Sequence, residues 1–468
     1  MTTSSFSIFD STFDDESLLC LVIGSVELSF AEVRRRAFRM RVLVGERLGA
    51  RPVAGARVAY VAHGDEVVHV LLLALLGMGA TAVPIHPKLT AGERDVLLEV
   101  ANPDLFLDEA ELLSAVADGS LDAVARALPP IAARDEEMPL AIVFTSGTTG
   151  RPKGALLSLR AFRASAVASA KALGWHPSDR WFLCMPLAHV GGIGVVVRCL
   201  LARKTVVHFG RRPFDATAAL ATMERTKTTI ASLVPTMLAR FVESSAPPPP
   251  SLRIALLGGA AASPSLLDRG RALGWPLVVT YGLTEACSHV TLGETADRSH
   301  DVGAPIPGTE VRVVDGQIAV RSRTLFSGYL DQPSPFDAEG FYATGDLGAL
   351  DAHGRLTIHA RRTDLVVTGG ENVYPREIEL CLEEIPGVSS AAVFGVPDET
   401  WGQIVAMAVV VAEGGPTLGQ LTTVLRARLA RHKLPRRGIL VDELPTNALG
   451  KLLRGRLLDL ADRLEPLS

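Results

Sequence analysis

The sequence predicts an α/β fold built on parallel sheets, with a smaller α+β unit at its C-terminal end. Over the first 300 residues, short apolar runs alternate with longer stretches rich in alanine and leucine, a pattern typical of alternating strands and helices. After about residue 300 the apolar runs are shorter and turns more frequent, which favours a β-rich subdomain. The 468 residues favour two or three compact units, and we expect domains over 1–363 and 364–468 with a hinge near Asp364.

Individual elements follow from these patterns. Five apolar runs predict strands of the large domain, at residues 57–62, 141–144, 205–209, 253–257 and 277–280. The apolar run 67–82 is too short for a membrane span and contains His69, so we expect a buried helix. The four prolines at 247–250 predict an exposed, extended spacer within the large domain.

The second half of the chain is expected to be rich in short strands. Strands are predicted at 311–314 and 317–320 in the β-rich subdomain. Beyond residue 364, the runs 378–385, 388–396 and 404–411 predict a small α+β unit, which ends in a basic helix over 418–432.

Composition limits the classes of function. Hydrophobic residues make up 48% of the chain and charged residues 21%, as in ordinary globular proteins. The net charge of −4 gives no general polyanion-binding face, so nucleic acid is not expected as a partner. Five scattered cysteines predict neither a zinc site nor a disulfide framework, and residues 1–15 do not resemble a secretory signal. We expect a soluble cytoplasmic enzyme without a membrane span, and the sequence leaves a homodimer open.

The most informative stretch is a glycine- and hydroxyl-rich loop that follows an apolar strand. Residues 145–154 read Thr-Ser-Gly-Thr-Thr-Gly-Arg-Pro-Lys-Gly. Glycines let backbone N–H groups turn toward an anion, hydroxyls add donors or metal ligands, and a lysine supplies a point charge for phosphate. The order differs from the Walker loop, in which the lysine directly precedes Ser or Thr. The loop therefore predicts a phosphate site whose candidates are Thr145, Ser146, Gly147, Thr148, Thr149, Gly150 and Lys153.

This loop resembles the signature loop of the adenylate-forming superfamily, which includes acyl-CoA and aryl-CoA ligases, luciferases and peptide-synthetase adenylation domains. The resemblance implies a large adenylate-forming domain and a small mobile C-terminal domain. It implies ATP, CoA and a small-molecule acid as substrates, with Mg²⁺ as the cofactor. The activity it implies has two steps, in which the acid first becomes an acyl-adenylate and the CoA thiol then displaces AMP.

A second motif, Tyr-Gly-Leu-Thr-Glu at 281–285, also follows an apolar strand, and ligands of α/β sheets bind at the carboxyl ends of strands. The resemblance implies that Tyr281 stacks on adenine, Thr284 contacts phosphate and Glu285 helps hold magnesium. It further assigns Gly259 to the ATP site and Thr148 to the metal. A solvated turn after a strand is the alternative for 281–285.

A third motif, Tyr-Ala-Thr-Gly-Asp at 342–346, ends in a carboxylate that can accept two hydrogen bonds from a ribose diol. The resemblance adds Arg361 to the same ribose site. An ordinary turn is the alternative at Asp346.

The remaining motifs lie in the C-terminal domain. A glycine pair, Gly369 and Gly370, precedes Pro375, which is suited to open a helix. The resemblance implies rotation about Asp364, with Gly369 and Gly370 lining the CoA site. It also implies that Lys451 stabilises the charge that develops during adenylation. Ala360 departs from the glycine usual in relatives.

Two segments give information on the substrate: residues 185–194 with Arg198, and residues 281–288. Both resemble the corresponding segments of 2-succinylbenzoate–CoA ligases of menaquinone biosynthesis. The second carboxylate of that acid needs donors or a cation. Candidates are Arg198, His189, Ser288 and His289, of which His189 is also a candidate catalytic residue with Glu285 and Lys451. A helix-surface arginine or a structural ion pair is the alternative for Arg198, and a buried, hydrogen-bonded imidazole is the alternative for His189. Ala188 departs from the aromatic residue usual before this histidine.

Three other functions stay open at this point. One is another CoA ligase, acting on a fatty, malonyl or aryl acid. A second is an adenylation module that loads a carrier protein. A third is a catalytically silent nucleotide-binding or scaffolding protein, although the combined presence of Lys153, Glu285, Asp346 and Lys451 counts against it.

Overall fold

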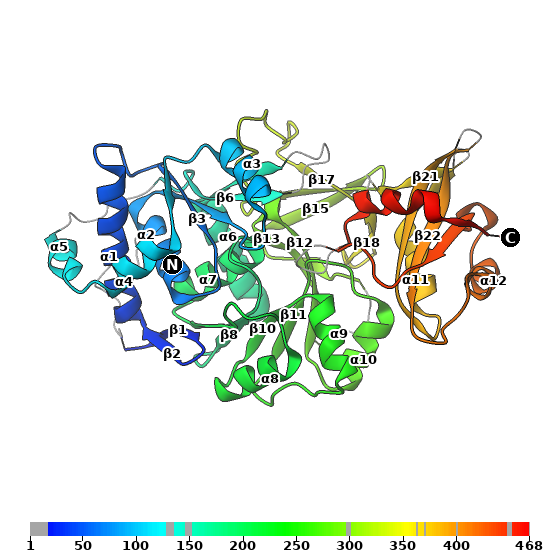
Figure 1. The fold of residues 1–468 in the computed structure, drawn as a ribbon, viewed down its shortest axis with the longest axis horizontal. Helices are drawn as coiled ribbons and strands as arrows, with labels where there is room; N and C mark the ends of the chain where they lie inside the picture. Colours follow the sequence, from blue (N-terminus) through cyan, green and yellow to red (C-terminus); the bar gives the residue numbers. More distant parts are fainter. Residues whose placement is uncertain are drawn as a thin grey trace.

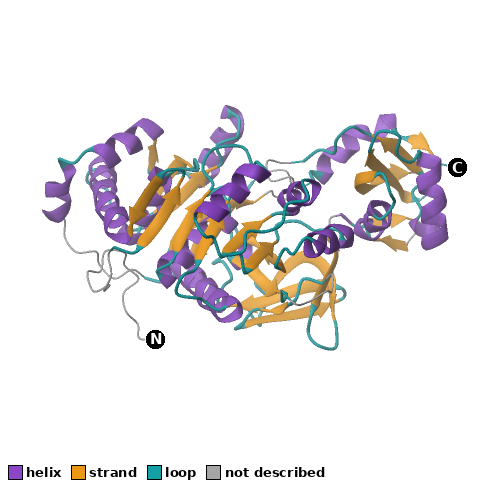
Figure 2. Cartoon of the chain, turned by 90° about the horizontal axis from the view of Figure 1, so that it is seen from below, coloured by secondary structure: helices purple, strands orange, loops and turns teal. Residues whose placement is uncertain are grey.

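The computed structural model describes residues 17–127, 135–145, 152–295, 301–361, 364–368, 371–398, 401–446 and 452–467, and within these it leaves the side chains of 125–127, 360, 361 and 372 undescribed. Four sheets organise these residues, and the α/β prediction is confirmed (Figures 1 and 2). In Figure 1 the blue-to-green large part and the orange-to-red C-terminal part lie at opposite ends of the long axis.

The first sheet is five-stranded, in the order β5-β3-β4-β6-β7. Its strands are β3 (Arg57–Val61), β4 (Thr81–Ile85), β5 (Leu105–Leu107), β6 (Pro139–Thr145) and β7 (Lys153–Ser158). Its neighbouring helices are α1 (Phe30–Leu48), α2 (Glu66–Met78), α3 (Ala91–Ala101), α4 (Glu109–Ala117) and α5 (Leu121–Ala127). The pairings are parallel except between β6 and β7.

The second sheet is nine-stranded, in the order β14-β13-β12-β11-β10-β8-β9-β1-β2. Its strands are β1 (Leu19–Ile23), β2 (Val26–Ser29), β8 (Arg180–Leu183), β9 (Thr205–His208), β10 (Ile230–Leu233), β11 (Ile254–Leu257), β12 (Leu277–Leu283), β13 (Ser288–Leu292) and β14 (Ala304–Pro305). Its helices are α6 (Leu159–Leu173), α7 (Val190–Ala202), α8 (Ala216–Arg225), α9 (Pro235–Glu243), α10 (Pro264–Ala272) and the 3₁₀ turn η1 (Thr284–Ala286). Because α6 packs on β7, β13 and α7, and α7 on β8, β9 and β13, this helix pair joins the two sheets into one core.

The β-rich subdomain is an antiparallel sheet of β15 (Thr309–Val314), β16 (Gln317–Ser322), β17 (Tyr342–Leu350) and β18 (Leu356–Arg361). The last sheet has the order β20-β19-β22-β23-β24, with β21 paired to β22. Its strands are β19 (Val366–Thr368), β20 (Glu371–Val373), β21 (Val388–Asp398), β22 (Gly402–Val411), β23 (Arg437–Leu440) and β24 (Glu465–Pro466). Its helices are α11 (Pro375–Glu383), α12 (Leu418–Arg428) and the 3₁₀ segments η3 (Arg431–Lys433) and η4 (Arg454–Arg463).

Several sequence-based expectations need correction. The apolar run 67–82 holds two elements, because α2 ends at Met78, left-handed Gly79 follows, and β4 begins at Thr81. The turn considered at Asp346 is wrong, since this residue lies inside β17. The expected basic helix ends at Arg428, four residues early, and continues only as η3.

Helix α2 illustrates why apolar length alone misleads. Its residues from Val67 to Gly77 are all buried, and the Asp65 side chain caps it by accepting a hydrogen bond from the N–H of Val68. A helix of 13 residues spans roughly 20 Å, which is less than a bilayer core. No helix in the described ranges is long and apolar enough to cross a membrane.

Candidate active site

The site begins at the carboxyl-terminal edge of the nine-stranded sheet. Strands β8, β10, β11 and β12 are parallel neighbours, so the segments that follow them leave the sheet at the same edge. His189 lies beyond β8, Gly259 beyond β11, and Thr284 and Glu285 beyond β12. The sheet thus brings together four predicted site residues that are up to 96 positions apart in the sequence.

The five-stranded sheet contributes a second edge. Strands β4 and β6 are parallel neighbours, and Thr145, the last residue of β6, is paired with Lys153 at the start of β7. Residues 146–151, which carry Ser146, Gly147, Thr148, Thr149 and Gly150, lie outside the described residues. The two described ends of the phosphate loop are therefore held together by the β6–β7 pairing.

His86 joins the two edges and was missed by sequence reasoning. It directly follows β4, and its ring centroid lies 5.3 Å from that of His189. Its Nδ1 accepts a hydrogen bond from the N–H of Lys88 at 3.2 Å, and its Nε2 is buried without a partner within the described structure. The available clue was a polar side chain at the carboxyl end of a predicted parallel strand, a position typical of ligand sites.

Both imidazoles are neutral at ordinary pH. Burial, with a smaller contribution from His86, lowers the pKa of His189 to about 4. Burial also lowers the pKa of His86, and the nearby Lys88 ammonium acts in the same direction. A neutral imidazole has one donor and one acceptor nitrogen, so this pair offers polar contacts without adding positive charge.

Glu285 is held by a tyrosine that no predicted motif contains. The hydroxyl of Tyr329 donates to Glu285 Oε1 at 2.6 Å and lies 3.0 Å from the hydroxyl of Tyr342. The ammonium of Lys153 lies 5.2 Å from the centroid of the Tyr329 ring. Burial and the Glu285 carboxylate raise the pKa of Tyr329, so it remains a protonated donor. Tyr329 therefore connects the phosphate-loop lysine with the predicted magnesium ligand.

The backbone explains why Tyr329 reaches this place. The N–H of Leu156 donates to the carbonyl of Gly328, and the N–H of Leu330 donates to the carbonyl of Gly154. These bonds fix the segment before β17 alongside β7, at the end where Lys153 lies. Nothing in the sequence indicated that Tyr329 lies in the site, because this pairing joins residues more than 170 positions apart.

Tyr281 and Asp346 meet across two sheets. The Tyr281 hydroxyl donates to Asp346 Oδ2 at 2.6 Å, and both side chains are largely buried. In the β17–β18 pairing Asp346 faces Arg361, of which only the backbone is described. The three residues assigned to adenosine are thus neighbours, and the tyrosine orients the carboxylate assigned to the ribose.

The predicted acid-binding residues fall into two groups. Arg198 is buried in α7, where its Nη2 donates to Ser165 Oγ at 2.9 Å, and Ser165 in turn donates to the carbonyl of Cys287 at 2.9 Å. His289 lies close enough for the Arg198 charge to lower its pKa further, although burial is the larger cause. Arg198 Nε and His289 Nδ1 are both buried without a partner in the described ranges. His189 belongs to the other group, with His86.

Ser288, the remaining predicted acid-binding residue, has an unusual backbone conformation. Its φ is 98°, a conformation rare outside glycine, and it is paired with Leu283 across the β12–β13 connection. Such strain is kept only where the surrounding structure enforces it, and it is often found at functional sites.

Within the described residues, buried Arg198 forms no ion pair with a carboxylate. Burial lowers the pKa of Arg198 to about 10, and the nearby thiols of Cys287 and Cys199 act in the opposite direction. A buried cation without a counter-charge is costly, which favours a site that an anion completes.

The residues present also fit a magnesium ion. Glu285 is a largely buried carboxylate, and its Oε2 accepts no hydrogen bond from the described part of the chain. In the same ranges no cluster of three or more His, Cys, Asp or Glu could hold a metal by itself. One carboxylate is in keeping with Mg²⁺, which keeps several waters and is bound largely through substrate phosphates.

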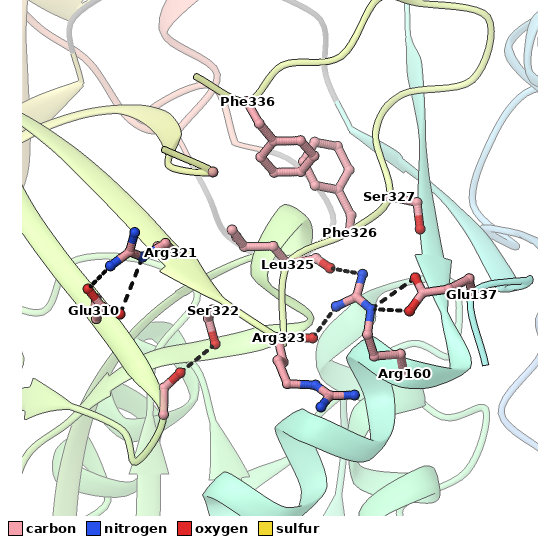
Figure 3. A pocket seen from close by; sticks show the side chains of 12 residues that line it. Glu137, Arg160, Glu310, Arg321, Ser322, Arg323, Leu325, Phe326, Ser327 and Phe336 are labelled. Atoms are coloured by element: carbon pink, nitrogen blue, oxygen red, sulfur yellow. Dashed lines mark hydrogen bonds and ion pairs between the residues drawn. The ribbon is translucent and has the colours of Figure 1, made fainter. Parts of the chain in front are cut away.

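A pocket whose lining includes Glu137, Arg160, Arg321 and Phe326 is shown in Figure 3. Two of its three arginines are paired locally, Arg160 with Glu137 and Arg321 with Glu310. Phe326 connects the pocket to the site, since its N–H donates to the carbonyl of Glu285 at 2.8 Å. None of the predicted site residues lines the pocket, so it is separate from the proposed chemistry.

Three predicted residues of the C-terminal part, Gly369, Gly370 and Lys451, lie outside the described residues. Asp364 is described, and its Oδ2 forms an ion pair with Arg454 Nε at 2.9 Å. Pro375 opens α11 at its first turn, as the sequence predicts.

Comparison with known proteins decides the family. The AMP-binding enzyme family matches residues 14–330, and the AMP-binding enzyme C-terminal domain matches residues 377–451. The chain belongs to the AMP-binding enzyme family. Its predicted resemblance to adenylate-forming enzymes is confirmed.

Similar members of this AMP-binding family include two curated relatives. A 2-succinylbenzoate–CoA ligase from Bacillus licheniformis is 35% identical over 81% of this chain and 84% of its own length. A 2-succinylbenzoate–CoA ligase from Bacillus subtilis is 32% identical over 94% of this chain and 95% of its own length.

Three solved structures, each 30% identical, are also similar. The Bacillus subtilis o-succinylbenzoate CoA synthetase with its acyl-adenylate has a TM-score of 0.83, covering 94% of this chain and 95% of that one. ATP-bound MatB from Rhodopseudomonas palustris has a TM-score of 0.87, and the match covers 97% of this chain and 98% of that one. A double mutant of the Bacillus subtilis synthetase with its product analogue OSB-NCoA has only 0.68, although it covers 97% of both chains.

Proposed function

We propose that this AMP-binding enzyme is an ATP-dependent 2-succinylbenzoate–CoA ligase that acts through an acyl-adenylate. The observation that carries the chemistry is the convergence of Lys153, Tyr329 and Glu285 beside the Tyr281–Asp346 pair. The similarity to 2-succinylbenzoate–CoA ligases over most of the chain supports the acid.

In the first step, a carboxylate oxygen of the acid attacks the α-phosphorus of ATP, and the bond to the bridging oxygen of pyrophosphate breaks. Asp346 and Tyr281 hold the nucleoside, and Lys153 faces the phosphates. Magnesium, when bound, neutralises charge on the triphosphate. Glu285 is placed to hold it, and catalysis consists mainly of positioning and charge stabilisation. Lys451 supplies a further positive charge to the reacting carboxylate and α-phosphate.

In the second step, the CoA sulfur attacks the acyl carbon, AMP leaves with one carboxylate oxygen, and the thiol proton is released. We assign Asp364 as the hinge about which the small domain rotates between the steps, with Gly369 and Gly370 facing CoA. The TM-score of 0.83 to the acyl-adenylate complex, against 0.68 to the complex with the CoA product analogue, supports an adenylation arrangement for this structure.

We further propose that Arg198 and His289 recognise the second carboxylate of the acid. Arg198 is a buried cation with an unpaired Nε, so an anionic substrate group would supply the missing counter-charge. We expect Arg198→Met to raise the apparent KM for 2-succinylbenzoate at least tenfold and to leave the KM for ATP unchanged. An unchanged KM for the acid in both Arg198→Met and His289→Ala would exclude the assignment.

A CoA ligase for another acid is the second candidate, because ATP-bound MatB matches with a TM-score of 0.87. Similarity of fold therefore does not distinguish 2-succinylbenzoate from other acids as the substrate. A panel assay of AMP release with ATP, magnesium and CoA, using 2-succinylbenzoate, benzoate, malonate and medium-chain fatty acids, separates the two. Preference for 2-succinylbenzoate, with the thioester confirmed by mass, supports the proposal; activity only on another acid contradicts it and keeps the mechanism.

A further inference from the structure

We infer that the ion pair between Asp364 and Arg454, here called the hinge pair, holds the C-terminal part in the orientation that performs adenylation. This inference rests on the proposed function, because it assigns a positioning role within the two-step reaction. The hinge pair joins Asp364 Oδ2 to Arg454 Nε at 2.9 Å, and the two side chains are only 20% and 24% exposed.

Arg454 has two other contacts, and both lie within the C-terminal part. Its Nη1 donates to the carbonyl of Val393 in β21 at 2.7 Å, and its Nη2 pairs with Glu379 Oε1 of α11 at 2.7 Å. Glu379 is almost fully buried and also accepts a hydrogen bond from the N–H of Val393 at 3.0 Å. Arg454 is therefore anchored to α11 and β21 independently of Asp364.

Asp364 is placed differently. It lies between β18, the last strand of the β-rich subdomain, and β19, the first strand of the six-stranded sheet. A rotation about the backbone near residue 364 changes the direction of the Asp364 side chain relative to Arg454. The same rotation leaves the distances among Arg454, Glu379 and Val393 unchanged, because these move together. Of the three Arg454 contacts, the hinge pair is the one that depends on domain orientation.

Arg454 also closely follows the segment that carries the proposed catalytic lysine. Thr446 and Leu452 form an antiparallel bridge, and the N–H of Leu453 donates to the carbonyl of Pro445 at 2.8 Å. These bonds fix both ends of the stretch that contains Lys451, and Arg454 is the next residue but one after Leu452. In Figure 1 the red C-terminal segment with η4 lies against β21, on the side facing β18. The guanidinium of Arg454 therefore links Asp364 at the hinge to the end of the segment that carries Lys451.

A second contact across the hinge supports this arrangement. The ring of His359 in β18 lies 6.0 Å from that of Tyr374, the residue that precedes α11, in an edge-on geometry. Two independent contacts therefore favour the orientation seen in this structure, and loss of either shifts the population toward the alternative orientation.

The test separates the two half-reactions with 2-succinylbenzoate as the acid. Asp364→Asn keeps the size of the side chain and removes its charge. Adenylation, measured as ATP–pyrophosphate exchange, should fall roughly three- to tenfold, the range for a partly buried ion pair. Thioester formation from preformed acyl-adenylate and CoA should be unchanged or faster. Arg454→Lys, which keeps the charge, should recover part of the adenylation lost in Arg454→Gln.

The control is Arg428→Gln, which breaks an exposed ion pair with Glu384 in the same part of the chain, with Arg428 Nη1 and Glu384 Oε2 2.7 Å apart. It should change neither half-reaction. In a double-mutant cycle, Asp364→Asn should have a smaller effect on adenylation when Arg454 is already Gln.

An equal loss in both half-reactions for Asp364→Asn, or no change in either, overturns the hinge-pair inference while the proposed function stands. If the wild type lacks exchange with 2-succinylbenzoate, the proposed substrate fails instead. The same ratio of half-reactions is then measured with the acid that does support exchange, and it decides the inference in the same way.

Discussion

Tyr329 shows how a single residue outside every motif organises this site. Its hydroxyl touches both Glu285 and Tyr342, and its ring faces the ammonium of Lys153. A hydrogen bond to a charged group contributes about 1.5–3 kcal/mol, more than a bond between two neutral groups. The orientation of Glu285 should therefore depend on this hydroxyl.

Tyr329→Phe removes that hydroxyl and keeps the ring. We expect kcat/KM for ATP to fall by roughly tenfold, with a higher magnesium concentration needed for half-maximal rate, because Glu285 loses its orienting donor. Steady-state kinetics at varied magnesium measures both quantities. Tyr342→Phe is the matched control, since it removes the contact between the two tyrosines but leaves the Tyr329–Glu285 hydrogen bond, and it should cost about threefold or less. Equal effects of the two substitutions would contradict the assigned role.

At the scale of elements, the sequence predicted most strands of the large domain because their apolar runs are uninterrupted. It placed Lys153 and Tyr281 in loops, whereas pairing across the sheets draws both into strands, β7 and β12. A turn was the alternative considered at Asp346, because Asp-Leu-Gly is common in turns, but here this segment lies in β17 and pairs with β18. His86 and Tyr329 could not be assigned, because their partners come from distant sequence.

Gly282 is the position in these elements that least tolerates a side chain. A Cβ there would overlap the carbonyl of Ser288 in β13, and this backbone cannot move without disturbing Glu285. We expect Gly282→Ala to destabilise the protein by at least about 2 kcal/mol and to abolish ATP–pyrophosphate exchange. Gly45→Ala, in α1 with open space around it, should instead be neutral or stabilising by about 0.5–1 kcal/mol. Urea unfolding of both variants checks this; a stable, active Gly282→Ala would contradict it.

At the scale of the whole molecule, buried histidines couple stability to pH. Burial lowers the pKa of His69 to about 4, and its ring centroid lies 4.8 Å from that of His208, whose pKa burial also lowers. The unfolded chain binds protons at these residues near pH 6.5, whereas the folded protein does not until about pH 4 for His69. Their contribution is therefore complete above pH 6.5 and is lost as the pH falls toward 4.

The free energy of unfolding should therefore fall measurably as the pH is lowered. Between pH 7 and pH 5, His69 alone should cost roughly 2 kcal/mol of the free energy of unfolding. His69→Gln should lower stability at pH 7 but flatten the acid dependence by about that amount. Urea midpoints at the two pH values measure the slope, and a variant as acid-sensitive as the wild type would argue against His69 as a source.

Three of the four sheets contribute predicted site residues: the five-stranded sheet carries Lys153, the nine-stranded sheet Tyr281 and the β-rich subdomain Asp346. Together they support one chemical claim, that the acid is activated as an adenylate. The direct measurement uses 2-succinylbenzoate labelled with ¹⁸O in its carboxylates, with ATP, magnesium and CoA, followed by mass spectrometry of the products. The account predicts AMP that carries one ¹⁸O atom, because the attacking carboxylate oxygen stays on phosphorus when CoA displaces the acyl group. Unlabelled AMP, or label in phosphate with release of ADP, would contradict it.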